Sequence, residues 1–407
     1  MENKIVRFGE LYQIPSSNGL SRPSAVRGIG FKMINMGELF ANNIISDIPM
    51  ERVQMSESEQ KKFFVEQGDL LFARQSLVAE GAGKCSIIKL FNEPTTFESH
   101  LIRVRLNQKI ANPWYYYYLF QLKSNPIKAI INQCAQAGIR GSELARVKVP
   151  NPPLPTQQKI ASILSAYDNL IQNYKKQIEA LQTAASELYK EWFVRFRFPG
   201  WQNAKFENGI PEGWKVERIG TLYDSTSGGT PSREHEEYFQ KGTYPWIKTG
   251  ELKDCPIIET EESITDEAIK HSSAKLFEKD SLIIAMYGAT IGQLGINKMK
   301  ATCNQACCVL RPKKDKAFGI YYLFHFFKEN REFIIGLGNG AAQQNLSQVL
   351  INKLKIVNPN KEILEIFEEK ESMFFEKIYS LQQQITNLTQ QRDLLLPRLM
   401  SGKLEVK

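Results

Sequence analysis

Long apolar segments are missing from this sequence. No stretch approaches the roughly 18 uninterrupted apolar residues that a membrane-spanning helix needs, so the chain is not expected to cross a membrane. The first residues, MENKIVRFGELYQIPSS, contain no apolar block that ends in a small-residue cleavage site, which argues against secretion. Cysteine is scarce, with 6 in 407 residues and no paired spacing, as is typical of a reduced, cytoplasmic protein.

Metal-ligand patterns are also missing. Cys303, Cys307 and Cys308 lie close together, but a zinc site requires a second pair of ligands at a matching spacing, and packed or free thiols explain them equally well. No Ser-His-Asp or paired-carboxylate arrangement is visible. The four histidines are scattered, and none has a metal spacing to a cysteine: His100, His235, His271 and His325. We therefore expect a protein without a metal site or catalytic residues of its own.

Two short motifs resemble catalytic sequences and fail on their details. Gly81-Ala82-Gly83-Lys84-Cys85 lacks the earlier glycine and the following Ser or Thr of a phosphate-binding loop, because Val78 and Cys85 occupy those places. Asn151-Pro152-Pro153-Leu154 is similar to the Asn-Pro-Pro-aromatic motif of amino-methyltransferases, but Leu154 cannot stack on a flipped base as an aromatic ring does. A proline-rich connector that ends a strand before a helix explains this segment better.

The composition is that of a folded protein with a positive excess outside two segments. Apolar residues make up 42% of the chain and charged residues 24%, which is enough for a packed core. Residues 157–192 carry no net charge and residues 361–395 carry −3. Because the whole chain carries +8, the remaining residues carry +11. That excess keeps a polyanion partner in view, although ordinary solvated surface charge remains an alternative.

An ordered series of motifs recurs along the chain at shifts of 204 to 213 residues, as in a tandem duplication with loop insertions. The matched pairs are Arg7-Phe8-Gly9 with Arg218-Ile219-Gly220, Gly37-Glu38-Leu39 with Gly250-Glu251-Leu252, Asp69 with Asp280, Tyr117-Tyr118-Leu119-Phe120 with Tyr321-Tyr322-Leu323-Phe324, and Asn151-Pro152 with Asn358-Pro359.

Each copy begins with about 150 residues that mix strands and short helices. LLFAR, LIRVRL and SLIIAM are rich in branched and aromatic residues and are bounded by Gly, Asp or Ser, so strands are expected there. Asn112-Pro113 before WYYYYLFQL is typical of an N-cap followed by proline in the first helical turn. The fold class predicted is α+β, with two similar globular domains.

Each copy ends in a long amphipathic helix. Apolar residues follow one another at steps of four and three, which is the spacing of a coiled-coil seam, and we expect the two helices to pair in an antiparallel coiled coil. Packing of each helix on its own domain is the alternative, and Glu371 and Arg392 interrupt the second seam. The predicted seam consists of Ile160, Leu164, Tyr167, Ile171, Tyr174, Ile178, Leu181, Ala185, Leu188 and Trp192, with Phe367, Phe374, Ile378, Leu381, Ile385, Leu388 and Leu395.

The chain resembles the DNA-specificity subunit of type I restriction-modification systems over essentially its whole length. FGELYQIPSSNG, GDLLFARQSLVAEGAG and FESHLIRVRL are similar to a first target-recognition domain of that family, and PLPTQQKIASILSAYDNLI and LYKEWFVRFRFPG to its central conserved region. SGGTPSR, YPWIKTGEL, YGATIGQLGI, NQACC and AAQQNLS are similar to a second target-recognition domain, and LLLPRLMSGKLEV to the distal end. The segment VNPNKEILEIF departs from the family's Pro-Pro-x-x-x-Gln-Gln-x-Ile pattern, which leaves the start of the second helix open.

The resemblance implies a domain order and a set of partners. It implies target-recognition domain 1 at 1–152, a central conserved helix at 153–195, target-recognition domain 2 at 196–357 and a distal conserved helix at 358–407. Each recognition domain would recognise one half of a bipartite, asymmetric site in double-stranded DNA. Two methyltransferase subunits would dock on the helices, and two motor-nuclease restriction subunits can join them. S-adenosylmethionine, ATP and Mg would belong to those partners, so this chain would bind no cofactor.

Base recognition requires polar side chains on loops that can enter a groove. Any one of the candidates could instead cap a turn. In the first copy they are Ser16, Ser17, Asn18, Arg74, Gln75, Ser76 and Arg140, and in the second Thr226, Ser227, Thr230, Ser232, Arg233, Tyr287, Asn304, Gln343, Gln344 and Asn345.

Three classes of function compete. A non-catalytic DNA-specificity subunit agrees with the repeat, the charge and the resemblance. A self-contained methyltransferase or nuclease would need a cofactor loop and an intact catalytic motif, which we do not find. A scaffold that binds only proteins would account for the helices but not for the +11 outside them.

Overall fold

The computed structural model describes residues 4–23, 26–76, 81–133, 137–313, 319–337 and 345–406. Chain contacts divide the protein into two compact units. Unit 1 is Met1–Ile171 with Leu388–Lys407, and unit 2 is Gln172–Asn387. Each unit thus contains one α+β fold and a part of each of two long helices. Among the described residues, no helix is both long and apolar enough to cross a membrane.

The core of unit 1 is a five-stranded sheet in the order β2-β10-β6-β8-β4. β6 and β8 are buried along their whole length, because apolar side chains occupy both faces of these central strands. The strands are β2 (Tyr12–Asn18), β10 (Leu101–Leu106), β6 (Leu70–Ala73), β8 (Cys85–Ile88) and β4 (Ile44–Ile45). Smaller sheets pair β1 (Ile5–Arg7) with β13 (Lys148–Pro150), β3 (Arg27–Ile34) with β5 (Arg52–Val53) and β9 (Thr95–Phe97), and β12 (Ala137–Gly138) with β7 (Gln75–Ser76) and β11 (Asn132–Gln133).

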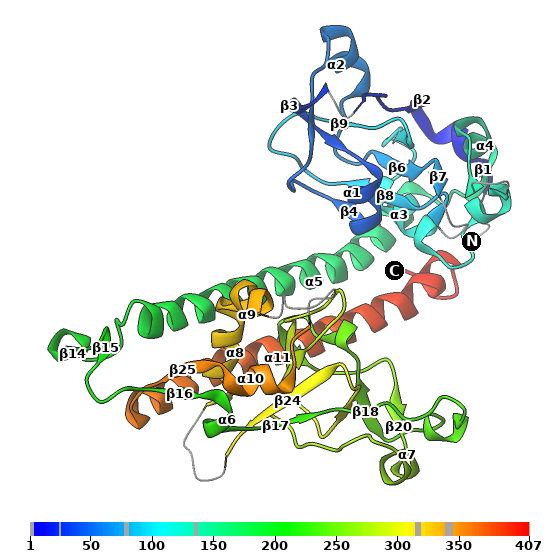
Figure 1. Cartoon of the computed structure of the whole chain (residues 1–407). Coiled ribbons are helices and arrows are strands. Elements are labelled where there is room, and N and C mark those ends of the chain that lie inside the picture. The colour runs from blue at the N-terminus through cyan, green and yellow to red at the C-terminus, as the bar shows by residue number, and fades with distance from the viewer. Residues whose placement is uncertain are drawn as a thin grey trace. The chain divides into compact units, whose positions relative to one another are not determined.

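Unit 2 repeats this topology. Its main sheet has the order β17-β24-β21-β22-β19, with the same sequence of antiparallel and parallel neighbours as in unit 1, and β17 and β24 run side by side (Figure 1). The strands are β17 (Tyr223–Ser227), β24 (Cys307–Pro312), β21 (Leu282–Ala285), β22 (Leu294–Asn297) and β19 (Cys255–Ile257). Smaller sheets join β16 (Lys215–Arg218) to β25 (Lys355–Asn358), β18 (Tyr244–Ile247) to β20 (Ser263–Ile264) and β23 (Thr302–Cys303), and β14 (Phe206–Glu207) to β15 (Ile210–Pro211).

Short helices connect the strands in both units. The Asn112 side chain accepts the Tyr115 N–H and caps α3, with Pro113 in the first turn, as the sequence predicts. Unit 1 has α1 (Met36–Ala41), α2 (Glu57–Phe63), α3 (Pro113–Gln121) and α4 (Gly141–Arg146). Unit 2 has α6 (Ile219–Leu222), α7 (Asp266–His271), α8 (Ile320–Glu329), α9 (Arg331–Leu337) and α10 (Gln348–Lys353). The three strands and the helix predicted from the sequence are confirmed as β6, β10, β21 and α3.

The two long helices are α5 (Leu154–Tyr189), followed by a π-helical turn at Lys190–Val194, and α11 (Lys361–Met400). In unit 1 the first turns of α5, at Ile160 and Leu164, share a core with the last turns of α11, at Leu396 and Leu399. In unit 2 the end of α5 shares a core with the first turns of α11. The helices therefore run antiparallel within each unit, as expected.

Both packing modes that the sequence left open occur together. Ile160 and Leu164 pack on α11 and also on the tyrosines of α3, while Trp192 packs on Phe367 of α11 within the core that holds α8. All predicted seam residues are buried or half-buried. Phe375 and Leu396, which the spacing did not select, are buried as well.

Candidate nucleic-acid interface

In unit 2 a tight turn connects β23, in the small sheet with β18, to β24, in the five-stranded sheet. Gly228, directly after β17, lies against this turn, and a Cβ atom built on it would stand 2.3 Å from the carbonyl oxygens of Cys303 and Asn304. The Gly229 N–H donates to Cys303 O at 2.9 Å. Only a residue without a side chain can approach the turn so closely, so the two glycines of SGGTP join the end of β17 to the turn.

Polar side chains from distant parts of the chain gather around this turn. Thr230 Oγ1 bonds to the Gln305 side chain, and Lys275 Nζ donates to Thr226 Oγ1 at 3.2 Å. Ser227 Oγ donates to Gln348 Oε1 at 3.0 Å. The structure thus brings together four predicted residues, Thr226, Ser227, Thr230 and Asn304, and adds three that the sequence did not indicate, Lys275, Gln305 and Gln348.

Unit 1 contains the same turn, between β9 and β10, and repeats its backbone hydrogen bonds. The matching donor–acceptor distances agree to within 0.1 Å in four cases. The pairs are Leu20 N–H to Phe97 O with Gly229 N–H to Cys303 O, Glu98 N–H to Ile34 O with Asn304 N–H to Ile247 O, Arg74 N–H to His100 O with Met286 N–H to Ala306 O, and Leu101 N–H to Glu98 O with Cys307 N–H to Asn304 O. By these bonds, three residues of unit 1 correspond to three of unit 2: Glu98 to Asn304, Ser99 to Gln305, and His100 to Ala306.

The predicted residues of unit 1 surround this second turn. The Ile139 N–H donates to Arg74 O at 2.9 Å, and β7 pairs with β12, so the segments at 74–76 and 137–140 lie together. A Cβ atom on Gly141 would stand 2.9 Å from Ser16 Oγ, and Asn18 pairs with Ile102 at the start of β10. Of the candidates here, Asn18 and Arg140 are exposed, while Ser16, Arg74, Gln75 and Ser76 are half-buried.

Other predicted residues have local roles. Ser17 Oγ is buried and has no hydrogen-bond partner among the described residues. The Arg233 guanidinium lies 4.1 Å from the centre of the Phe239 ring and forms an ion pair with Glu262 at 2.7 Å. Ser232 Oγ accepts the Glu234 N–H at 3.3 Å. Two further candidates flank the unit 2 turn, since the Leu346 N–H donates to Met286 O: Tyr287 is half-buried and Asn345 is exposed. Gln343 and Gln344 lie outside the described residues.

Alignment of the two turns by their backbone hydrogen bonds identifies His100 and Gln305, neither of which the sequence had indicated. Phe97 and Cys303 correspond at a shift of 206, within the range of the conspicuous repeats, but residues 97–101 and 303–307 are identical at no position. Once the turns are aligned, His100 of unit 1 and Gln305 of unit 2 are the exposed members of their turns. Both side chains can therefore meet a ligand at the same end of their sheets.

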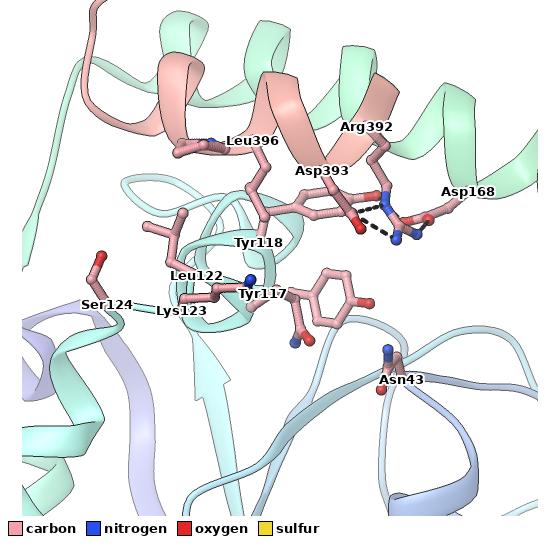
Figure 2. A pocket seen from close by; sticks show the side chains of 12 residues that line it. Asn43, Tyr117, Tyr118, Leu122, Lys123, Ser124, Asp168, Arg392, Asp393 and Leu396 are labelled. Atoms are coloured by element: carbon pink, nitrogen blue, oxygen red, sulfur yellow. Dashed lines mark hydrogen bonds and ion pairs between the residues drawn. The ribbon is translucent and has the colours of Figure 1, made fainter. Parts of the chain in front are cut away.

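A separate cavity of about 480 Å³ lies within unit 1, between α3, α5 and α11. Figure 2 shows Arg392 of α11 directed at Asp168 and Asp393, which it reaches at 2.5 and 2.8 Å. The Tyr118 hydroxyl donates to the other oxygen of Asp168 at 2.6 Å. Burial raises the pKa of Tyr118 well above its usual range, and the Asp168 carboxylate raises it further. Asp168, Arg392 and Asp393 are thus paired with one another, and with Tyr118 they connect the three helices.

Unit 2 has a different polar pair where α8 meets α11. His325 Nε2 lies 2.9 Å from Glu371 Oε2, and both side chains are almost fully buried. Burial raises the pKa of Glu371 to about 8 and lowers that of His325 to about 3, so at neutral pH both groups are mostly uncharged. One turn earlier, Glu368 accepts the backbone N–H groups of Tyr321 and Tyr322, and burial raises its pKa to about 7. Glu371, which interrupts the apolar seam of α11, therefore forms a buried hydrogen bond to His325 of α8.

The Asn-Pro-Pro-Leu motif and the cysteine cluster, both set aside in the sequence, lie within the folded structure. Asn151 Oδ1 accepts the Tyr116 hydroxyl at 2.9 Å and Gln157 Nε2 at 2.8 Å, so the Asn-Pro-Pro-Leu segment ties α3 to the start of α5. Cys303, Cys307 and Cys308 are buried free thiols, and burial raises the pKa of Cys308 to about 12. Within the described residues, no group of three or more His, Cys, Asp or Glu side chains is placed to hold a metal ion.

Comparison with known protein families gives matches over nearly the whole chain. The family model described as type I restriction modification DNA specificity domain matches twice, at residues 2–183 and 211–393. The type I restriction enzyme MjaIX specificity subunit of Methanocaldococcus jannaschii is 32% identical, over 72% of this chain and 69% of that protein. The HindI specificity subunit of Haemophilus influenzae is 22% identical, over 91% of this chain and 94% of its own.

A solved structure has the same fold. The S subunit of a type I restriction-modification system from M. genitalium superposes with a TM-score of 0.61, covering 97% of this chain and 95% of that one. Its sequence identity to this chain is 15%, so the likeness supports the arrangement of strands and helices and no individual residue.

Proposed function

Because the chain belongs to the type I restriction-modification DNA specificity family, we propose that each of its two units recognises one half of a bipartite, asymmetric site in double-stranded DNA. The observation that carries this proposal is the duplicated turn. One backbone arrangement, matched bond by bond, occurs in both units and displays different polar side chains in each. A duplicated scaffold with divergent side chains is what independent recognition of two different half-sites requires.

The charge distribution supports nucleic acid as the ligand. The positive excess of +11 lies outside the segments 157–192 and 361–395, and therefore mostly in the two α+β folds. Contacts from lysine and arginine to phosphates supply most of the affinity for DNA, and polar side chains at strand ends and turns supply specificity. We assign the recognition role to the predicted residues around the two turns, within domains at 1–152 and 196–357.

We assign the role of docking partner proteins to α5 and α11, in the conserved regions at 153–195 and 358–407. Both helices carry exposed apolar side chains, at Ile163, Leu170, Ile366, Met373 and Leu394, of which Met373 and Leu394 are 68% and 64% exposed. Apolar side chains on a helix with no net positive charge suit a protein partner better than a phosphate backbone. The partners proposed are two methyltransferase subunits, joined by two motor-nuclease subunits, in the cytoplasm. S-adenosylmethionine, ATP and Mg would be bound by those partners.

The test of DNA recognition uses the full chain in complex with its methyltransferase subunits. We expect selection from random duplex DNA to enrich two short motifs separated by a fixed spacer. Exchanging residues 1–150 for the equivalent part of a relative should change one motif and leave the other as it was. Enrichment of a single continuous motif, or a change in both halves together, would refute independent recognition.

The test of docking replaces an exposed apolar side chain on a helix. We expect Met373→Glu or Leu394→Glu to weaken association with the methyltransferase subunit by roughly 10-fold or more, measured by titration, because a charge would enter an apolar contact. Leu90→Glu is the matched control, since Leu90 is 65% exposed but lies outside both helices. Equal weakening by all three substitutions would speak against the helices as the docking surface.

A further inference from the structure

The unit 1 turn carries an exposed histidine that a buried carboxylate holds in place. His100 Nδ1 lies 3.1 Å from Glu98 Oε2, and the imidazole is 53% exposed, whereas the Glu98 side chain is only 11% exposed. The other carboxylate oxygen, Glu98 Oε1, accepts the Met36 N–H at 2.7 Å. Glu98 is thus fixed at both oxygens, and it orients a ring that extends into solvent.

The turn of unit 2 is built differently at these positions. His100 corresponds to Ala306, which is buried, and Glu98 corresponds to Asn304. Asn304 Oδ1 accepts the Ala306 N–H at 3.2 Å, so this side chain caps its own turn. The exposed side chain of the unit 2 turn is Gln305, bonded to Thr230. The histidine and its carboxylate are therefore particular to unit 1 and are not needed to form the turn.

The second ring nitrogen of His100 is available to a ligand. Nε2 has no hydrogen-bond partner in the part of the chain that the structure describes. A histidine that serves only to stabilise a fold usually bonds through both nitrogens or lies buried, and His100 does neither. It stands beside Arg74, whose N–H donates to His100 O at 2.8 Å, and at the start of β10 next to the strand that ends in Asn18.

We propose that His100 contacts a base edge in the half-site that unit 1 recognises, and that Glu98 is its positioning residue. This inference rests on the proposed function. A carboxylate only accepts hydrogen bonds, so Nδ1 donates to Glu98, and in the uncharged form of the ring Nε2 is then an acceptor. In the major groove the donors offered by bases are the amino groups of adenine N6 and cytosine N4. His100 therefore selects adenine or cytosine at the position that it contacts.

The first experiment removes the ring. Site selection from random duplex DNA is carried out with the full chain in complex with its methyltransferase subunits, for the unaltered chain and for His100→Ala. We expect the variant to lose preference at one position of the unit 1 half-site by roughly 5- to 20-fold, as for the loss of one hydrogen bond to a base. The unit 2 half-site should not change. Unaltered preference at every position would overturn the proposal.

The second experiment reverses the polarity of the ring. In Glu98→Gln the amide oxygen can keep the Met36 N–H, so the amide NH₂ faces Nδ1 and donates to it. The ring proton then moves to Nε2, which becomes a donor and suits guanine O6 or N7, thymine O4 and adenine N7. We expect guanine and thymine, which the unaltered chain rejects, to be accepted at the contacted position, and cytosine, which offers no acceptor in the major groove, to be rejected. An equal loss of affinity for all sequences, or an unchanged preference, would refute the positioning role.

Two comparisons separate failure of this inference from failure of the proposed function. Lys109→Ala removes an exposed polar side chain beyond the other end of β10, and it should leave both half-sites unchanged. If the unaltered complex enriches a bipartite site that His100→Ala recognises equally well, only the role of His100 is wrong. If the unaltered complex enriches no sequence, the proposed function itself fails. Thermal melting of each variant identifies any loss of preference that results from unfolding.

Discussion

Helices α5 and α11 enter the core of both units, and the two units surround them with different chemistry. In unit 2 the contact is aromatic. Phe367 of α11 is fully buried, with ring centres 4.8 Å from Phe193 and 5.8 Å from Trp192. In unit 1 the residue at the equivalent place is Ile160 of α5, at the repeat shift of 207, and the surrounding rings come from α3. The duplicated fold has thus kept its topology while its helix contacts have diverged.

The polar groups differ in the same way. Unit 1 uses an ion pair, Asp168 with Arg392, on the wall of a cavity, where the arginine side chain is 26% exposed. Unit 2 uses Glu371 with His325, in which both members are buried and mostly uncharged at neutral pH. A partly solvated site can hold opposite charges, whereas full burial favours the neutral forms of both groups. The difference in solvent access therefore accounts for the difference in charge state.

The largest effect is expected from the aromatic contact of unit 2. Phe367→Ala should destabilise the protein by about 3–5 kcal/mol, because it leaves a cavity among rings that cannot collapse to fill it. Ile160→Ala, at the equivalent place in unit 1, should cost about 2–3 kcal/mol, since fewer atoms are removed. Both values are accessible by denaturant unfolding. If Ile160→Ala proved the more costly, the aromatic cluster would not be the main anchor of the helices.

The next effect is expected at the ion pair between Asp168 and Arg392 in unit 1. Arg392→Leu should destabilise the protein by about 2–3 kcal/mol, because it leaves the Asp168 carboxylate, which is 6% exposed, without its cation. Adding Asp168→Asn should restore most of the lost stability, since no buried charge then remains. Arg398→Leu, an exposed position on the same helix, serves as the control and should change stability by less than about 0.5 kcal/mol. A double variant as unstable as Arg392→Leu would show that packing of the arginine stem, not charge, is what was lost.

The sequence predicted the elements of this fold better than their polar contacts. Strands β6, β10 and β21 and helix α3 follow from local composition and from the Asn-Pro cap, which depend on neighbouring residues alone. Glu371 and Arg392 were identified only as interruptions of an apolar seam, because their partners His325 and Asp168 are 46 and 224 residues away. His100 was missed for the same reason, since its equivalence to Ala306 depends on backbone bonds between distant strands.

The smallest of these effects depends on pH and distinguishes the neutral pair of unit 2. The pKa of Glu371 is raised by burial to about 8, above the value of an unfolded chain. Its contribution to stability is therefore fully present below about pH 4.5 and is lost as pH rises through 8. His325 acts in the opposite sense: its pKa is lowered to about 3, so its contribution is present above about pH 6.5 and is lost as pH falls toward 3.

Glu371→Gln isolates the carboxyl group, because an amide keeps the shape and the bond to His325 but does not ionise. The variant and the unaltered protein should have similar stability near pH 5. The difference should then grow in favour of the variant, by about 1–3 kcal/mol, as pH rises to 9. Glu365→Gln is the matched control on the same helix, since its exposed carboxylate forms an ion pair with Lys361, and its effect should stay below about 0.5 kcal/mol at every pH. Denaturant midpoints measured from pH 5 to 9 decide the question. A difference between Glu371→Gln and the unaltered chain that does not vary with pH would mean that Glu371 is ionised in the folded protein, and the contrast between a charged pair in unit 1 and a neutral pair in unit 2 would then be lost.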